Sequence, residues 1–206
     1  MLKKIRTKAN WIKEHLSDEY VQKAQHDGYR SRAAYKFLQI HEQYKLIKPN
    51  HRVVDLGSAP GSWSQAISSL LSEEGKIYAI DLLPMDPINK TTFIQGDFRD
   101  EVILHDLEKI IENKPVDLVI SDMAPNISGN KVRDQAMIND LNELTLEFAQ
   151  DWLKPKGNFL VKTFMGSGFD EFVKKLKNHF SKVIIKKPDS SRDRSAELFL
   201  IGLEKL

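Results

Sequence analysis

The sequence predicts a doubly wound α/β domain with a seven-stranded, mostly parallel sheet and helices on both faces. From residue 52 onward, short apolar stretches of strand length alternate with segments of helical periodicity. The first predicted strand leads into a glycine-rich turn and then a helix, as in nucleotide-type cofactor sites. The last two predicted strands are joined by the short polar loop 188–195, so we expect this final pair to be antiparallel.

Residues 1–29 form a polar, basic segment ahead of the main domain, which we expect to span residues 30–206. One helix is expected near residues 10–24, and Gly28 then breaks the chain. Residues 31–46 carry apolar side chains at helical spacing, with Ser31 as a plausible N-cap. Pro49 and Asn50 end this second helix.

Strands and helices then follow in alternation. The expected strands cover residues 52–56, 76–80, 92–95, 117–121, 158–163, 182–187 and 197–203. The expected helices cover residues 64–72, 101–112, 139–153 and 168–179. The helix over 139–153 is amphipathic, with Leu141, Leu144, Phe148 and Trp152 on one side.

Composition excludes several classes of site. The chain has no cysteine, which excludes disulfides, thiolate zinc sites and a cysteine nucleophile and fits an intracellular, cytoplasmic setting. The 6 histidines are scattered, so no metal site is expected. No apolar run approaches the roughly 20 residues of a membrane helix, and the basic N-terminus lacks the apolar core of a signal peptide. Nothing demands a dimer, so a monomer is expected.

Charge is distributed unevenly along the chain. Residues 1–50 hold 11 Lys/Arg against 5 Asp/Glu, whereas the remainder holds 20 against 24. A basic segment joined to a mildly acidic domain indicates a polyanionic partner. A lysine-rich, solvated helix face would give the same counts.

The glycine turn contains a carboxylate that indicates the type of cofactor. It reads Asp55-x-Gly57 and continues to Gly61, so the acidic residue directly precedes the turn. A pyrophosphate is bound by backbone N–H groups with no anion nearby, whereas a cationic cofactor tolerates the carboxylate. S-adenosylmethionine carries a sulfonium and an ammonium group, so the turn favours methyl transfer over dinucleotide chemistry.

Further cofactor contacts are expected at the carboxyl ends of the strands. Gly57 and Gly61 allow close backbone approach, and Trp63 is either a contact or an anchor at the helix start. Asp81 ends the second strand, where a carboxylate accepts from ribose hydroxyls. Asp97 follows the third strand, where a carboxylate accepts from the adenine amino group. Each aspartate alone would more often be a helix cap, but the two together, in register with the glycine turn, favour cofactor binding.

Four charged residues form the candidate catalytic cluster: Lys36, Asp122, Lys162 and Glu197. Asp122 and Lys162 end the fourth and fifth strands, Glu197 opens the last strand, and Lys36 lies on the helix before the sheet. A buried lysine beside another cation releases its proton more readily, and a neutral lysine can take a proton from a hydroxyl. The alternative is two ordinary salt bridges.

These residues lie in strings that together resemble one family almost end to end. The chain is similar to the bacterial FtsJ/RrmJ (RlmE) family of large-subunit ribosomal RNA ribose 2′-O-methyltransferases. The strings are SRAAYK at 31–36, DLGSAPG at 55–61, DLLPMDP at 81–87, QGDFRD at 95–100, SDMAPN at 121–126, KPDSSR at 187–192, and Glu197. One departure is Ser62, where the family usually has glycine, and we expect a small effect.

The resemblance implies a single Rossmann-like S-adenosylmethionine-dependent methyltransferase domain. It places the family's catalytic Lys-Asp-Lys-Glu pattern on the four residues named above, with Lys162 as the base. It places cofactor contacts on Gly61, Trp63, Asp81, Asp97 and Asp122. The implied substrate is a uridine in large-subunit (23S) rRNA, methylated on the assembled or late-assembling large ribosomal subunit.

We expect basic residues of the N-terminal segment and of the 186–194 loop to contact the phosphates of the RNA. These are Lys3, Lys4, Arg6, Lys8, Arg30, Arg32, Arg192 and Arg194. Relatives with the same tetrad act on transfer RNA or an mRNA cap, and that alternative stays open. So does a ribosome-assembly factor that binds RNA and uses the cofactor only structurally. A small-molecule or protein methyltransferase would account for the cofactor residues, but not for the two lysines or the basic N-terminus.

Overall fold

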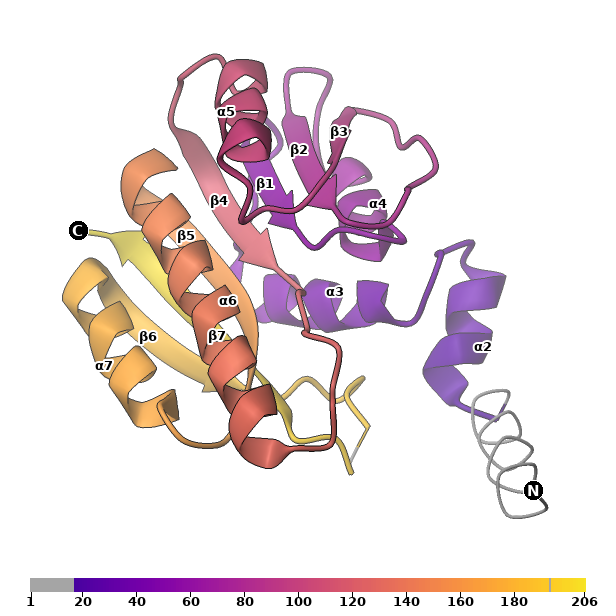
Figure 1. The fold of residues 1–206 in the computed structure, drawn as a ribbon. Helices are drawn as coiled ribbons and strands as arrows, with labels where there is room; N and C mark the ends of the chain where they lie inside the picture. The colour runs from indigo at the N-terminus through magenta and orange to yellow at the C-terminus, as the bar shows by residue number, and fades with distance from the viewer. Residues whose placement is uncertain (1–16, 193) are drawn as a thin grey trace.

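The fold of the computed structural model is a seven-stranded sheet with helices on both faces (Figure 1). The structure describes residues 17–192 and 194–206. The strand order is β3-β2-β1-β4-β5-β7-β6. Strands β1 to β5 pair in parallel, and β7 runs antiparallel to both of its neighbours, β5 and β6. The predicted fold class and the antiparallel final pair are therefore confirmed.

The strands are β1 Arg52–Leu56, β2 Lys76–Asp81, β3 Thr91–Gln95, β4 Val116–Ser121, β5 Leu153–Phe164, β6 Phe180–Lys186 and β7 Glu197–Lys205. The helices are α2 Glu19–His26, α3 Ala33–Tyr44, α4 Ser62–Ser68, α5 Glu101–Ile110, α6 Lys131–Trp152 and α7 Phe169–His179. In the part of the chain that is described, none of these helices is both long and apolar enough to cross a membrane.

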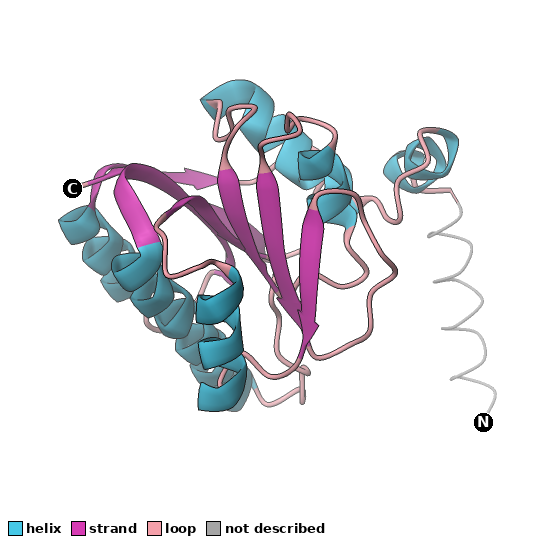
Figure 2. Cartoon of the chain, turned by 90° about the horizontal axis from the view of Figure 1, so that it is seen from above, coloured by secondary structure: helices cyan, strands magenta, loops and turns pink. Residues whose placement is uncertain are grey.

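The helices form two layers, which are clearest in the view from above (Figure 2). Helices α3 and α4 cover one face of the sheet, and α5, α6 and α7 cover the other. Side chains alternate between the faces along each strand, so Val53 packs toward α3 and α4 whereas Val54 packs toward the other layer. Because both faces are covered, the central strands are almost wholly buried.

Several predicted boundaries differ from the structure, and three of the differences have a local cause. Helix α6 begins at Lys131, eight residues earlier than expected, because the Asn130 side chain accepts hydrogen bonds from two backbone N–H groups and caps it. Strand β5 begins at Leu153 instead of 158, because pairing with β4 starts before an irregularity in the register. Ser31 is not the N-cap of α3; Arg32 holds that position, although the Ser31 Oγ accepts from the Ala33 N–H (3.2 Å).

The described part of the N-terminal segment packs onto α3. Asp18 caps α2, which begins later than the helix expected at 10–24, and residues 1–16 lie outside the described part. The rings of Tyr20 and Tyr29 each lie 5.6 Å from the Tyr35 ring, centroid to centroid. The Tyr35 hydroxyl donates to Asp27 (2.7 Å). Residues 17–29 therefore share contacts with the helix that carries Lys36, and the separate 1–29 segment stays a prediction.

Replacing Phe37 by Ala should destabilise the fold, because this side chain is fully buried between α3 and the sheet and packs 5.8 Å from the Trp63 ring. Loss of a buried phenylalanine typically lowers the free energy of unfolding by about 3–5 kcal/mol. Urea denaturation measures it. Gln43→Ala, an exposed change on the same helix, should alter it by less than about 0.5 kcal/mol. Equal effects of the two changes would contradict this packing.

Candidate functional site

The turn after β1 has a backbone that only glycine adopts without strain. Gly57 has a φ of +76° and Gly61 a φ of +100°, in the left-handed region. A Cβ atom on Gly57 would lie 2.3 Å from the Met123 Cγ, and one on Gly61 would lie 2.6 Å from the Arg30 Nη1. Both glycines are therefore required by conformation, and Gly57 also by the close approach of Met123; their contact with the cofactor stays a prediction.

Asp81 holds this turn in place. One of its carboxylate oxygens accepts from the Ala59 N–H (2.8 Å), inside the turn, and the other accepts from the Leu83 N–H (2.8 Å). Carboxylate oxygens each have a second lone pair. Asp81 thus sits at the carboxyl end of β2, beside the glycine turn, with acceptor capacity remaining for a hydroxyl group.

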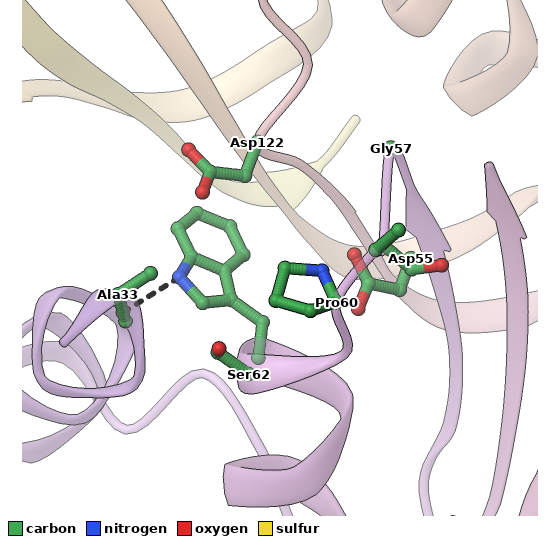
Figure 3. Close-up of a pocket in the computed structure, with 9 residues that line it drawn as sticks. Ala33, Asp55, Gly57, Pro60, Ser62 and Asp122 are labelled. Carbon is green, nitrogen blue, oxygen red and sulfur yellow. Dashed lines mark hydrogen bonds between the residues drawn. The ribbon is translucent and has the colours of Figure 1, made fainter. Parts of the chain in front are cut away.

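A small pocket lies against the turn (Figure 3). It is lined by Ala33, Asp55, Gly57, Ser58, Ala59, Pro60, Ser62, Trp63 and Asp122. The Trp63 indole is 2% exposed, and its Nε1–H donates to the Ala33 carbonyl (2.8 Å). Trp63 is therefore a buried anchor between α4 and α3 and, at the same time, part of the pocket wall.

Asp55 is a buried carboxyl group at the base of this pocket. Its Oδ2 accepts from the Ser64 hydroxyl (2.6 Å), whereas its Oδ1 is buried and has no hydrogen-bond partner in the described chain. Burial raises the pKa of Asp55 to about 7, and the nearby charges of Asp122 and Asp81 act in the same direction against the Ser64 hydrogen bond. A cationic ligand in the pocket would favour the ionised form.

Asp97 lies at the end of β3 and is held by its own loop. The Arg99 side chain donates from Nε (3.0 Å) and Nη2 (2.6 Å), and the Arg99 backbone N–H donates as well (3.0 Å). Hydrogen bonds from the Arg99 side chain are the main cause that lowers the pKa of Asp97. Asp97 is thus ionised and fixed in orientation, on the edge of the sheet that also carries Asp81.

Lys162 and Asp122 form the first of two buried ion pairs. The Lys162 Nζ lies 2.8 Å from the Asp122 Oδ1 and donates to the Asp122 carbonyl (2.5 Å). The Lys162 side chain is only 11% exposed. Asp122 follows β4 directly and lines the pocket, so the pair connects the end of β5 with the pocket wall.

Lys36 and Glu197 form the second pair, with the Lys36 Nζ 2.6 Å from the Glu197 Oε1. The Ser191 hydroxyl donates to the same oxygen (2.8 Å). Burial would raise the pKa of Glu197, but the charge and hydrogen bond of Lys36, the Ser191 hydrogen bond and the charge of Lys162 outweigh it and lower this pKa. Glu197 is therefore ionised.

The two pairs belong to one cluster. Lys162 lies opposite Phe199 in the β5–β7 register, and Glu197 lies opposite Phe164, two positions further along β5. The Lys36 Nζ sits 5.8 Å from the Phe199 ring centroid. The predicted tetrad is thus assembled from α3, β4, β5 and β7 around one aromatic ring, next to the pocket.

The arginines expected at an RNA surface are engaged within the protein. Arg30 donates to the Pro60 carbonyl (2.7 Å) and the Pro87 carbonyl (2.9 Å), joining the glycine turn to the loop after β2. Arg32 pairs with Asp18 and donates to the Ser190 carbonyl. Arg192 contacts Asp18 as well (3.2 Å). Arg194 also has a partner. Lys3, Lys4, Arg6 and Lys8 lie outside the described residues.

Two serines that the sequence analysis did not assign to the site support it. The hydroxyls of Ser31 and Ser62 lie 2.6 Å apart, so Ser62 ties the start of α4 to the turn that leads into α3. Ser191 fixes Glu197, as described above. No sequence signal identifies either contact, because each joins segments whose proximity depends on the fold.

Comparisons with known proteins agree with this geometry. Residues 29–205 match the family described as FtsJ-like methyltransferase. The chain belongs to the FtsJ-like methyltransferase family. It is 56% identical over 204 residues to the ribosomal RNA large subunit methyltransferase E of Methylobacillus flagellatus, covering 99% of each chain. It is 52% identical over 193 residues to the protein of that name from Chromobacterium violaceum, covering 94% of each.

Solved structures show the same fold. A Plasmodium falciparum structure described as a ribosomal RNA methyltransferase superposes with a TM-score of 0.77 at 32% identity, covering 86% of this chain and 99% of that one. Aeropyrum pernix fibrillarin, solved with S-adenosylmethionine bound, has a TM-score of 0.58 at 16% identity, covering 85% and 75%. The latter likeness is one of fold alone.

As a member of the FtsJ-like family, the chain uses S-adenosylmethionine as its cofactor. The pocket fits this group in its charge. The unpaired Asp55 Oδ1 together with Asp122 gives it the anionic lining that a sulfonium and an ammonium group need. Among the described residues, no group of His, Cys, Asp or Glu side chains is arranged to hold a metal ion.

The buried Asp55 should make folding stability depend on pH. Its pKa of about 7 in the folded state lies above its ordinary value of 3.8. Between these values the folded chain keeps a proton that the unfolded chain loses, so the Asp55 contribution to stability falls as pH rises, by at most about 1.4 kcal/mol per unit. The free energy of unfolding of Asp55→Asn should therefore rise relative to that of the wild type by up to about 3 kcal/mol between pH 5 and pH 8.

Denaturant unfolding of the wild type and Asp55→Asn at both pH values measures this gain, and subtracting the two proteins removes the contributions of other titrating groups. If the free energies of unfolding of the two proteins differ by the same amount at both pH values, the raised pKa of Asp55 is contradicted.

Proposed function

We propose that this protein transfers a methyl group from S-adenosylmethionine to the ribose 2′-hydroxyl of a uridine in large-subunit (23S) ribosomal RNA. The observation that carries the proposal is the buried Lys162–Asp122 pair at the wall of the cofactor pocket, with the Lys36–Glu197 pair beside it. The names of the relatives support the RNA substrate. We propose the assembled or late-assembling large subunit as the form in which that RNA is met.

The residues proposed to hold the cofactor converge on the pocket. The backbone of the turn at Gly57 and Gly61 would approach it closely, with Trp63 as part of the wall. Asp81 would accept from the ribose hydroxyls through its free lone pairs, and Asp97 would accept from the adenine amino group. When bound, S-adenosylmethionine would supply a methyl group activated by its sulfonium charge, with the neutral thioether as the leaving group.

Lys162 is proposed to manage the proton of the 2′-hydroxyl. A ribose hydroxyl is a weak acid, so negative charge builds up on its oxygen as the new bond forms. A neutral Lys162 would accept the proton, and a charged Lys162 would stabilise the developing alkoxide. Asp122 contacts the Lys162 Nζ through both its carboxylate and its carbonyl, which fixes the amine in place. Much of the rate would come from positioning the two reactants.

Lys36 and Glu197 are proposed to position the ribose. Lys36 is held between the Glu197 carboxylate and the Phe199 ring, so its charge is fixed near Lys162. That charge would attract the phosphate next to the target nucleotide. Glu197 is itself fixed by Ser191. An RNA-binding assembly factor without catalytic activity would need no such buried lysines.

The basic N-terminal residues, Arg192 and Arg194 remain our candidates for phosphate contacts around the target. Lys3, Lys4, Arg6 and Lys8 carry most of this charge in the sequence. The contacts of Arg30 and Arg32 within the protein indicate that these two arginines mainly hold loops together. The target is expected in an unpaired or distorted segment, where a 2′-hydroxyl is accessible.

Lys162→Ala should reduce methyl transfer to large ribosomal subunits by at least about 100-fold, since general acid–base groups contribute on the order of 10²–10⁴ in rate. Cofactor affinity, measured by calorimetry, should change little, because Lys162 is not among the residues that line the pocket. Lys182→Ala is the matched control, since it removes an exposed lysine from the same sheet. Turnover of Lys162→Ala within tenfold of the wild type would exclude Lys162 from the proposed role.

A further inference from the structure

A second concave region lies at the opposite end of the sheet, and we call it the basal groove. It has a volume of about 490 Å³. Its lining comprises Tyr44, Lys45, Lys48, His51, Asp117, Lys154, Pro155, Lys156, Asn158, Leu203 and Glu204. These residues come from the end of α3, the amino ends of β1, β4 and β5, and the carboxyl end of the antiparallel β7.

The basal groove is remote from the tetrad. Lys156 and Lys162 lie on the same strand, β5, and six residues at about 3.3 Å each separate them by roughly 20 Å. A ligand in the groove is therefore not the reacting nucleotide. It could instead be another part of the same large substrate.

The groove carries excess positive charge. Four lysines line it, from positions 45, 48, 154 and 156, against the two carboxylates of Asp117 and Glu204. Lys154 pairs with Asp117. Lys45, Lys48 and Lys156 are exposed and form no ion pair with any residue in the described part of the chain. Three cations of this concave surface are thus available to an external anion.

Two of these lysines stand where the backbone favours glycine. Lys45 has a φ of 52° and Lys156 a φ of 63°, in the left-handed region that is unfavourable for residues with a Cβ atom. Lys45 also caps the end of α3, a position usually taken by glycine. Both cations are present although the local conformation disfavours any side chain there.

We infer that the basal groove binds the phosphodiester backbone of ribosomal RNA at a stretch distant from the target nucleotide, an inference that rests on the proposed function. Lysines without an ion-pair partner on a concave surface can contact phosphates, and such charge-based contacts dominate the affinity of proteins for RNA whatever its sequence. Tyr44 adds a half-buried aromatic ring to the lining, and unpaired bases stack on such rings. The substrate would then be held at both ends of the sheet.

The double variant Lys45→Gly/Lys156→Gly tests this site. It removes two groove charges and places glycine where φ is positive, so folding should be preserved or improved. The control variant Lys174→Ala/Lys177→Ala removes two exposed lysines from α7. Binding is measured by filter retention over a series of KCl concentrations, with two probes: undermethylated large ribosomal subunits and protein-free 23S rRNA. Methyl transfer at saturating subunits is measured in parallel.

The groove variant should bind both probes about tenfold more weakly at low salt, and the slope of log affinity against log salt should become shallower by about 2. Methyl transfer at saturation should stay near the wild-type rate, and the control variant should bind as the wild type does.

Unchanged affinity and slope in the groove variant would overturn the inference. Loss confined to the assembled subunit would overturn it too, because the occupant would then be a protein. A wild type that binds subunits but methylates none would contradict the proposed function and leave the groove result standing.

Discussion

The site depends on accommodating two lysine side chains that are almost removed from water. An ammonium group that is almost removed from water needs a carboxylate and further hydrogen bonds to be tolerated. Asp122 provides these for Lys162, and Glu197, backed by Ser191, provides them for Lys36. The partners come from different elements, so the requirement fixes how α3, β4, β5 and β7 meet.

The sheet topology satisfies this requirement and places the cofactor beside it. Parallel strands bring the ends of β1, β2 and β4 to one edge, where the glycine turn, Asp81 and Asp122 lie together. The antiparallel β7 begins at that edge with Glu197 and runs away from it. Trp63 connects the pocket with α3, because it lines the pocket and also anchors α4 to α3 through the Ala33 carbonyl.

The sequence predicts the fold class well because apolar periodicity and the glycine turn are local signals. It also indicates that Asp122 and Lys162 lie close together, since the ends of neighbouring parallel strands share one edge. It misplaces the starts of α6 and β5, where the Asn130 cap and the irregular β4–β5 register override the apolar pattern. The internal contacts of Arg30 and Arg32 and the unpaired oxygen of Asp55 depend on segments far apart in the chain, so no local pattern contains them.

The most direct measurement of the central claim is the position and chemistry of the transferred methyl group. Large ribosomal subunits from a strain that lacks its own enzyme are incubated with the protein and tritiated S-adenosylmethionine, and the labelled RNA is then digested with nucleases and with alkali. A ribose 2′-O-methyl group blocks alkaline cleavage at its own phosphodiester bond. The account predicts label in one alkali-resistant dinucleotide that carries a methylated uridine. Label on a base, on transfer RNA alone, or on no RNA would contradict it.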